Sequence, residues 1–178
     1  MDTIEFYIKR TVVPWGRIDM ATMFVNGVDF IELAREYETP LAKKGDDTCS
    51  PGDYMNVMPY ALFRILASPE PKDYDENGRL LILLCSCGID ECNSLFMKIR
   101  ETEQTVIWED FKKIRSEDWD YSNFGPFEFD KTHYFHQIEN PTYDLNTQDD
   151  SFVGRFRDDE EKYYWYRQAG REDWLEDD

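Results

Sequence analysis

The chain has 178 residues, with 38 acidic residues against 20 Lys and Arg, so its formal net charge is −18. Its composition is 41% hydrophobic and 16% aromatic, which is enough for one folded domain and excludes a wholly disordered chain. The negative charge argues against direct binding to nucleic acid or to anionic membrane surfaces, because both are themselves negatively charged.

The first 30 residues predict a group of paired strands. Residues 4–13 alternate imperfectly between apolar and polar side chains, and residues 18–25 alternate more regularly, so we expect a strand over each. Asn26 and Gly27 follow directly and are typical of a type I′ hairpin turn, in which both central residues need positive φ. A short returning strand is expected over residues 28–30.

Two helices are expected next. Residues 30–38 place apolar side chains at helical spacing, with Asp29 suited to cap the helix and Pro40 suited to end it. The second helix is expected over residues 59–66, with Pro59 in its first turn.

The central part of the chain predicts three consecutive strands. Residues 80–87 carry no charge and fit a buried strand, while residues 93–100 and 105–111 alternate in polarity. Strict alternation in the third strand puts Trp108 and Asp110 on the same face. We expect an antiparallel meander, in which each strand pairs with the one before it.

The C-terminal part predicts one more helix and then polar chain. Asp130 is a suitable N-cap for a helix that reaches about Glu139 and stops before Pro141. Residues 142–151 read as a polar linker, and residues 157–178 as a strongly charged tail.

Three motifs in the central region resemble those of a family of uncharacterised bacterial proteins. These are C-x-C-G-x-x-x-C over residues 85–92, W-x-x-F over residues 108–111 and G-P-F-x-F-D over residues 125–130. The resemblance covers roughly residues 80–134. It implies a shared fold and no catalytic residues, since no activity is established for that family.

Cysteines are the first candidates for a chemical site. Cys85 and Cys87 are two residues apart on a predicted strand and point the same way, and Cys92 lies across the turn. Structural zinc sites usually contain paired C-x₂-C motifs, which this spacing does not match. We therefore expect buried thiols and no cofactor, with zinc bound by these three cysteines as the alternative.

Catalytic motifs are missing from the sequence. His133 and His136 are its two histidines, and we interpret them as part of a polar helix face. There is no phosphate-binding glycine loop, no G-x-S-x-G and no H-E-x-x-H. We do not expect an enzyme.

Acidic and aromatic residues are concentrated near the end of the chain. Residues 140–178 contain 12 acids and 5 bases, a net charge of −7, whereas residues 1–139 contain 26 acids and 15 bases, a net charge of −11. Such a segment suits a basic partner, although it would also fit an amphipathic helix packed on the sheet. The candidate partner-binding residues are Asp158, Asp159, Glu160, Glu161, Tyr163, Tyr164 and Trp165.

Together these features predict an α+β fold. We expect an antiparallel sheet of about six strands, with a meander around residues 80–112 and three or four helices mainly on one face. Residues 1–140 would form a single domain, and residues 141–178 an acidic, aromatic extension packed on it.

The expected function is that of a cytoplasmic binding protein. Its N-terminal sequence has an acid at position 2 and no apolar run of signal-peptide length. The specific hypothesis is an immunity protein that neutralises a basic toxin domain, for example a nuclease, through an acidic surface. A metal-binding or redox protein that uses Cys85, Cys87 and Cys92 is the alternative.

Overall fold

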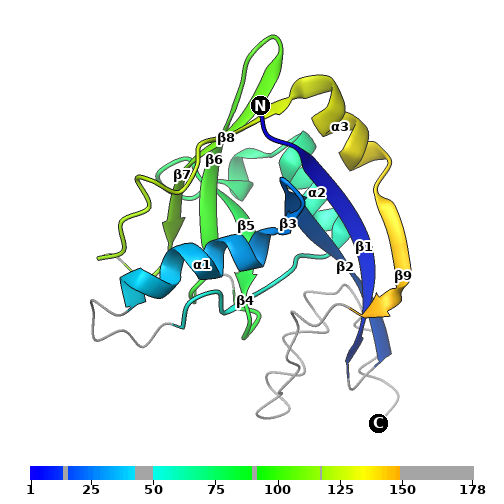
Figure 1. The fold of residues 1–178 in the computed structure, drawn as a ribbon, viewed down its shortest axis with the longest axis horizontal. Coiled ribbons are helices and arrows are strands. Elements are labelled where there is room, and N and C mark those ends of the chain that lie inside the picture. Colours follow the sequence, from blue (N-terminus) through cyan, green and yellow to red (C-terminus); the bar gives the residue numbers. More distant parts are fainter. Residues whose placement is uncertain (14–15, 43–49, 90–91, 117, 149–178) are drawn as a thin grey trace.

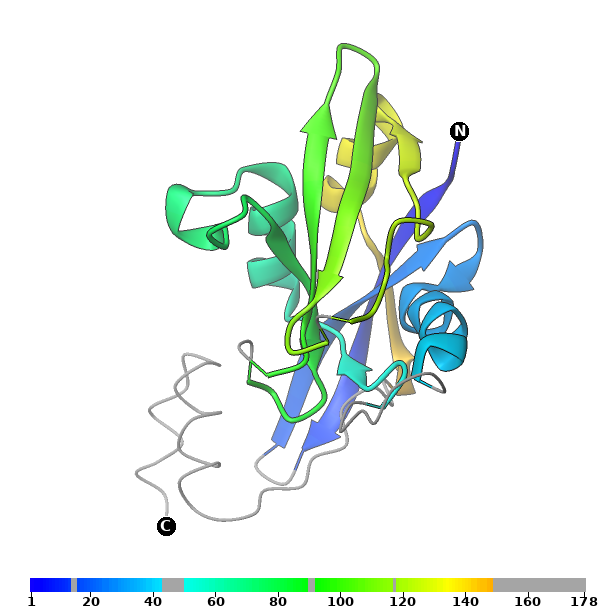
Figure 2. The same ribbon diagram turned by 90° about the vertical axis from the view of Figure 1, so that its left-hand side faces the viewer.

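The computed structural model describes residues 1–13, 16–42, 50–89, 92–116 and 118–148. Within these residues the chain has an α+β fold with nine strands and three α-helices, in two sheets that Figures 1 and 2 show from two directions. The first sheet has the strand order β3-β2-β1-β9. Its strands are β1 (Ile4–Val13), β2 (Gly16–Val25), β3 (Val28–Asp29) and β9 (Thr142–Gln148).

The second sheet is antiparallel throughout and contains the predicted meander. Its order is β4-β5-β6-β7-β8, so the three central strands are neighbours in space as in sequence. The class and the meander are confirmed, but the strands divide between two sheets where one was expected. The strands are β4 (Tyr54–Met55), β5 (Leu80–Cys85), β6 (Leu95–Glu101), β7 (Thr105–Lys113) and β8 (Phe127–Asp130).

The two sheets are joined at one edge through the start of the chain. The Asp2 N–H donates to the Glu128 carbonyl at 2.6 Å, and the Asp2 carboxylate accepts from the Glu128 N–H at 2.7 Å. The same carboxylate accepts from the Asn26 side chain at 2.8 Å. Asp2 thus ties the hairpin turn of the first sheet to β8 of the second.

Three α-helices pack around these sheets: α1 (Phe30–Ala42), α2 (Pro59–Ala67) and α3 (Lys131–Glu139). A short 3₁₀ helix, η1 (Pro71–Asp73), follows α2. In Figure 1, α2 and α3 lie beside each other, and each contacts both sheets. Helix α1 contacts β2 and β3 of the first sheet, and its Phe30 also packs on Trp108 of β7 in the second.

The predicted helix caps are confirmed. Asp29 accepts from the Ile31 N–H, and Asp130 accepts from the His133 N–H, each at 2.8 Å. The predicted end of α1 at Pro40 is wrong, because the helix continues to Ala42. Proline lacks an N–H but sits here in the exposed last turn, where water can satisfy the freed carbonyl.

The predicted polar linker after α3 is also wrong, because Thr142–Gln148 forms β9. This strand pairs in parallel with β1, with Tyr7 opposite Thr142 and Ile8 opposite Tyr143. Tyr143 is 69% exposed, so β9 buries little side-chain surface. Backbone pairing to β1 forms the strand, and the apolar alternation that signals a strand is absent.

The core centres on Trp108, which is fully buried. Its ring makes edge contacts with Phe30 of α1 and Phe129 of β8, with ring centroids 5.6 and 5.1 Å apart. Its indole N–H donates to the Tyr134 hydroxyl of α3 at 3.2 Å. Burial raises the pKa of Tyr134, so that hydroxyl stays neutral. One side chain thus links two helices to the second sheet.

β7 departs from regular alternation at Asp110. Phe96 pairs with Lys112 while Lys98 pairs with Glu109, so two residues of β7 oppose one of β6, and Asp110 has a φ of +54°. This is a β-bulge, and it reverses the facing of the residues that follow. The predicted shared face of Trp108 and Asp110 is wrong: Trp108 is buried and Asp110 is exposed.

No helix in the part of the chain that the structure describes has both the length and the apolar character to cross a membrane.

Substitution of Gly125 by alanine tests how tightly the Gly-Pro-Phe segment is packed. Gly125 and Gly27 have φ of +82° and +77°, so alanine at either should cost about 1 kcal/mol of backbone strain. A Cβ at Gly125 would also lie 3.1 Å from the Phe111 ring, whereas a Cβ at Gly27 has nothing within 4 Å. Gly125→Ala should therefore lower the free energy of unfolding in urea more than Gly27→Ala. Equal losses would contradict this packing.

Candidate functional site

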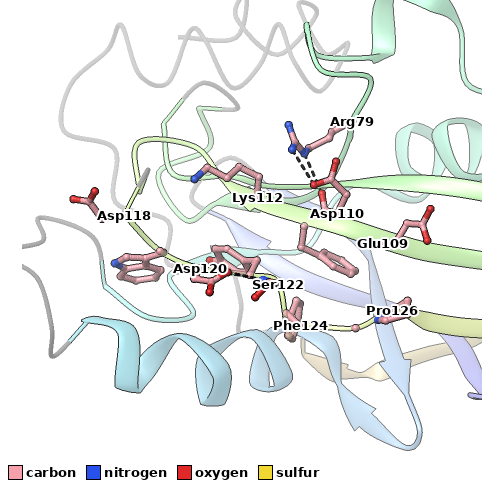
Figure 3. Close-up of a pocket in the computed structure, with 13 residues that line it drawn as sticks. Arg79, Glu109, Asp110, Lys112, Asp118, Asp120, Ser122, Phe124 and Pro126 are labelled. Carbon is pink, nitrogen blue, oxygen red and sulfur yellow. Dashed lines mark hydrogen bonds and ion pairs between the residues drawn. The ribbon is translucent and has the colours of Figure 1, made fainter.

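A groove on the outer side of β7 combines acidic and aromatic residues, and it is called the acidic groove below. It has a volume of about 590 Å³ and lies between β7 and the segment that leads to β8. Figure 3 shows Asp118 toward one end and Glu109 toward the other. Its charged lining residues are Arg79, Glu109, Asp110, Lys112, Asp118 and Asp120, and its aromatic ones are Phe111, Trp119, Tyr121 and Phe124.

Two of the four acids in the groove are balanced by bases. Glu109 pairs with Arg100 at 2.9 Å, and this hydrogen bond lowers the pKa of Glu109. Asp110 pairs with Arg79 at 2.9 Å and with Lys98 at 2.8 Å. The bulge makes these last pairs possible, because it directs the Asp110 side chain outward.

The lining of the groove contains four acids against two bases, Arg79 and Lys112, and the other two acids have no basic partner among the described residues. Asp118 and Asp120 are both exposed, and neither forms an ion pair with any residue that the structure describes. The Ser122 N–H donates to Asp120 at 2.9 Å and lowers the pKa of this carboxyl. Asp120 therefore keeps its charge in mildly acidic solution.

The aromatic residues form the floor of the groove. Trp119, Tyr121 and Phe124 are 4%, 6% and 7% exposed, so only a small part of each ring reaches the groove. Tyr37 of α1 stacks on Tyr121 with ring centroids 5.7 Å apart, and its hydroxyl donates to the Asp120 carbonyl at 2.7 Å. The floor is thus held against α1.

Beneath the groove lies a fully buried ion pair between Glu38 of α1 and Lys113 of β7. Both side chains are 0% exposed, and the nearest nitrogen and oxygen are 3.3 Å apart. Glu38 also accepts hydrogen bonds from the hydroxyls of Tyr54 and Tyr121, the latter at 2.6 Å, and from the Gly52 N–H at 2.7 Å. Both carboxylate oxygens are therefore satisfied.

Lys113 has its own set of partners. Its Nζ donates to the Ser50 carbonyl at 3.1 Å. It also lies over the rings of Tyr54 and Trp119, 4.5 and 4.8 Å from their centroids. These cation–π contacts partly replace the water that the ammonium loses on burial.

The two tyrosines remain hydrogen-bond donors. Burial raises the pKa of Tyr54, and the negative charge of Glu38 raises it further. The same two causes raise the pKa of Tyr121. Because Tyr121 belongs both to this cluster and to the groove, the buried pair fixes the position of the groove floor. The side chains of Glu38 and Lys113 themselves are fully buried.

Three cysteine sulfurs also come together, at the turn between β5 and β6. The Sγ atoms of Cys85, Cys87 and Cys92 all lie within 4.8 Å of one another. Cys85 is buried, whereas Cys87 and Cys92 are partly exposed. The prediction that all three are buried thiols is therefore wrong for the latter two.

Two further groups of residues were singled out from the sequence. The acidic and aromatic segment Asp158–Trp165 lies outside them. His133 and His136 are exposed on α3, and their rings lie 3.1 Å from the Ile4 carbonyl and 3.3 Å from the Asn140 amide nitrogen.

Sequence reasoning missed the buried pair, although a signal for Glu38 was present. Phe30, Ala34 and Glu38 are spaced four residues apart and are all buried on one side of α1. A carboxylate on an apolar helix face must find a partner in the interior. Nothing local identifies that partner as Lys113, 75 residues further along.

No family model, curated protein or solved structure matches the chain. The functional argument therefore depends on the geometry described above.

The buried pair should behave as one unit in a double-mutant cycle. Glu38→Gln or Lys113→Met alone should each destabilise the fold by about 3–5 kcal/mol, because each leaves an uncompensated buried charge. The double variant should lose much less than the sum in urea unfolding.

The exposed pair Lys131–Glu101, with side chains 33% and 45% exposed, is the control. Its coupling should be about 1 kcal/mol or less. Additive losses at Glu38 and Lys113 would show that they do not interact.

Proposed function

We propose that the protein binds a basic protein partner through its acidic surface. The observation that carries the proposal is the acidic groove, where Asp118 and Asp120 lie beside Trp119 and Tyr121 and form no ion pair with any residue that the structure describes. Carboxylates attract the cation of an Arg or Lys side chain, and the apolar part of the groove can contact its apolar stem.

The charge of the whole chain would act before contact is made. A net charge of −18 attracts a basic partner over a Debye length or more and raises the association rate. The groove would then act at short range. Its floor is held by Glu38 and by Tyr37, so little side-chain entropy is lost when a partner binds.

More specifically, we propose that the partner is a toxin domain and that the protein is its immunity protein. A domain that cleaves nucleic acid needs a basic surface to bind phosphates, and an acidic protein can cover that surface. An inhibitor of this kind would act in the cytoplasm of the cell that it protects. The small size and the strong acidity of the chain support this assignment.

Two surfaces are candidates for the contact. One is the acidic groove, and the other is the segment Asp158–Trp165, which has the same combination of carboxylates and aromatic rings. Charge reversal at each surface separates them.

We expect Asp118→Lys with Asp120→Lys to slow association with the partner by about tenfold at low ionic strength and to flatten its salt dependence. Asp159→Lys with Glu160→Lys tests the C-terminal segment in the same way. The partner is first captured from the source cells with the wild-type protein, and association is then measured with purified components.

The matched control is Glu103→Lys with Glu139→Lys, which makes the same change in net charge at two exposed positions outside the groove. Equal slowing by all three variants would mean that only net charge matters. Unchanged kinetics in the first two variants would reject both surfaces.

The immunity hypothesis needs a second readout. If the captured partner cleaves nucleic acid, equimolar protein should abolish cleavage, and inhibition by the groove variant should develop about tenfold more slowly at low ionic strength. A partner that is bound but remains fully active would contradict the immunity assignment and leave binding intact.

A further inference from the structure

We infer that Cys85, Cys87 and Cys92 form a binding site for one zinc ion at the turn between β5 and β6. The inference is independent of the proposed function. Its basis is that three thiol sulfurs lie within 4.8 Å of one another, and those of Cys85 and Cys87 are 3.1 Å apart. Three thiols from eight consecutive residues thus meet at one point.

The turn itself brings the three sulfurs together. Cys85 is the last residue of β5, and its carbonyl accepts from the Gly88 N–H at 2.7 Å. Gly88 has a φ of +79°, which few other residues adopt readily, so the chain reverses tightly there. The Cys92 N–H then donates to the Ile89 carbonyl at 3.1 Å, which places Cys92 back beside the first two cysteines.

The base of the turn is also held in place. The Cys85 N–H donates to the Ser94 hydroxyl at 2.9 Å, and the Ile114 N–H donates to the Ser94 carbonyl at 3.1 Å. Ser94 is fully buried. The first cysteine is thus anchored to the residues directly before β6 and directly after β7, as a preformed ligand should be.

The sulfur separations fit the size of a zinc ion. With Zn–S bonds of about 2.3 Å, tetrahedral coordination puts two sulfurs roughly 3.8 Å apart. The observed range, from 3.1 Å to at most 4.8 Å, spans that value, so side-chain rotations suffice. Because Cys87 and Cys92 are partly exposed, water can supply the fourth ligand.

A divalent cation would compensate the mutual repulsion of three thiolates whose sulfurs lie within 4.8 Å of one another.

The competing chemistry is a disulfide. Cys85 and Cys87 sulfurs at 3.1 Å are closer than ordinary contact, yet a disulfide needs about 2.05 Å. Oxidation would consume two of the three ligands and abolish the site. The experiment must therefore measure metal and free thiols on the same sample.

Reduced, tag-free protein stripped of metal should bind one equivalent of Zn²⁺. It should also bind one equivalent of Co²⁺, with the visible bands of tetrahedral cobalt and a sulfur-to-cobalt charge-transfer band, and Zn²⁺ should displace the cobalt. Thiol titration of the same sample should find every cysteine reduced. Absence of these bands, or binding of less than a tenth of an equivalent, overturns the inference.

Variants identify the ligands. Cys87→Ser and Cys92→Ser should each weaken Zn²⁺ binding by more than about 100-fold. Removal of a residue that only hydrogen-bonds to a metal ligand already costs up to about 100-fold, so loss of a ligand should cost more. Both positions are partly exposed, so these variants should fold, which circular dichroism checks. Cys49→Ser leaves only the three proposed ligands and should retain full binding. Loss of binding in Cys49→Ser, or normal binding in Cys87→Ser, rejects the three-cysteine site.

Discussion

The rest of the structure depends on one buried interaction, the ion pair between Glu38 and Lys113. Its partners come from α1, β4, β7 and the segments that precede β4 and β8. Neither charge can be hydrated where it lies, so each of these elements must stay within hydrogen-bonding distance of the others. A polar cluster of this kind restricts the core to one arrangement more strictly than apolar contacts do, because apolar side chains can repack.

The bulge at Asp110 makes this interaction compatible with the sheet. One extra residue in β7 turns Lys113 inward and leaves Asp110 outside, where it meets Arg79 and Lys98. The same distortion therefore creates both the interior pair and the charged wall of the acidic groove. The buried ion pair and the charged residues of the groove thus both depend on the β-bulge at Asp110.

The parts of the fold that could be predicted from sequence follow local rules. The Asn26-Gly27 turn, the cap at Asp130 and the meander each depend on a few neighbouring residues. Features that depend on distant pairing could not be predicted. Strand β9 forms because its backbone pairs with the edge of β1. Lys113 is buried because it forms an ion pair with Glu38 in the core.

The candidate sites follow the same division. The three cysteines could be named from sequence because they lie within eight residues, but their closeness depends on the turn geometry. The acidic groove could not be named, because its charge balance depends on which acids are paired across strands.

The link through Asp2 has a consequence for how the chain folds. Asp2 bonds to Glu128, 126 residues away, and β1 finds its parallel partner only in β9. Contacts of such high sequence separation form late and slow the folding reaction. During synthesis one edge of β1 therefore stays unpaired until nearly all of the described chain has left the ribosome. In that interval the nascent protein is most exposed to aggregation and to chaperones.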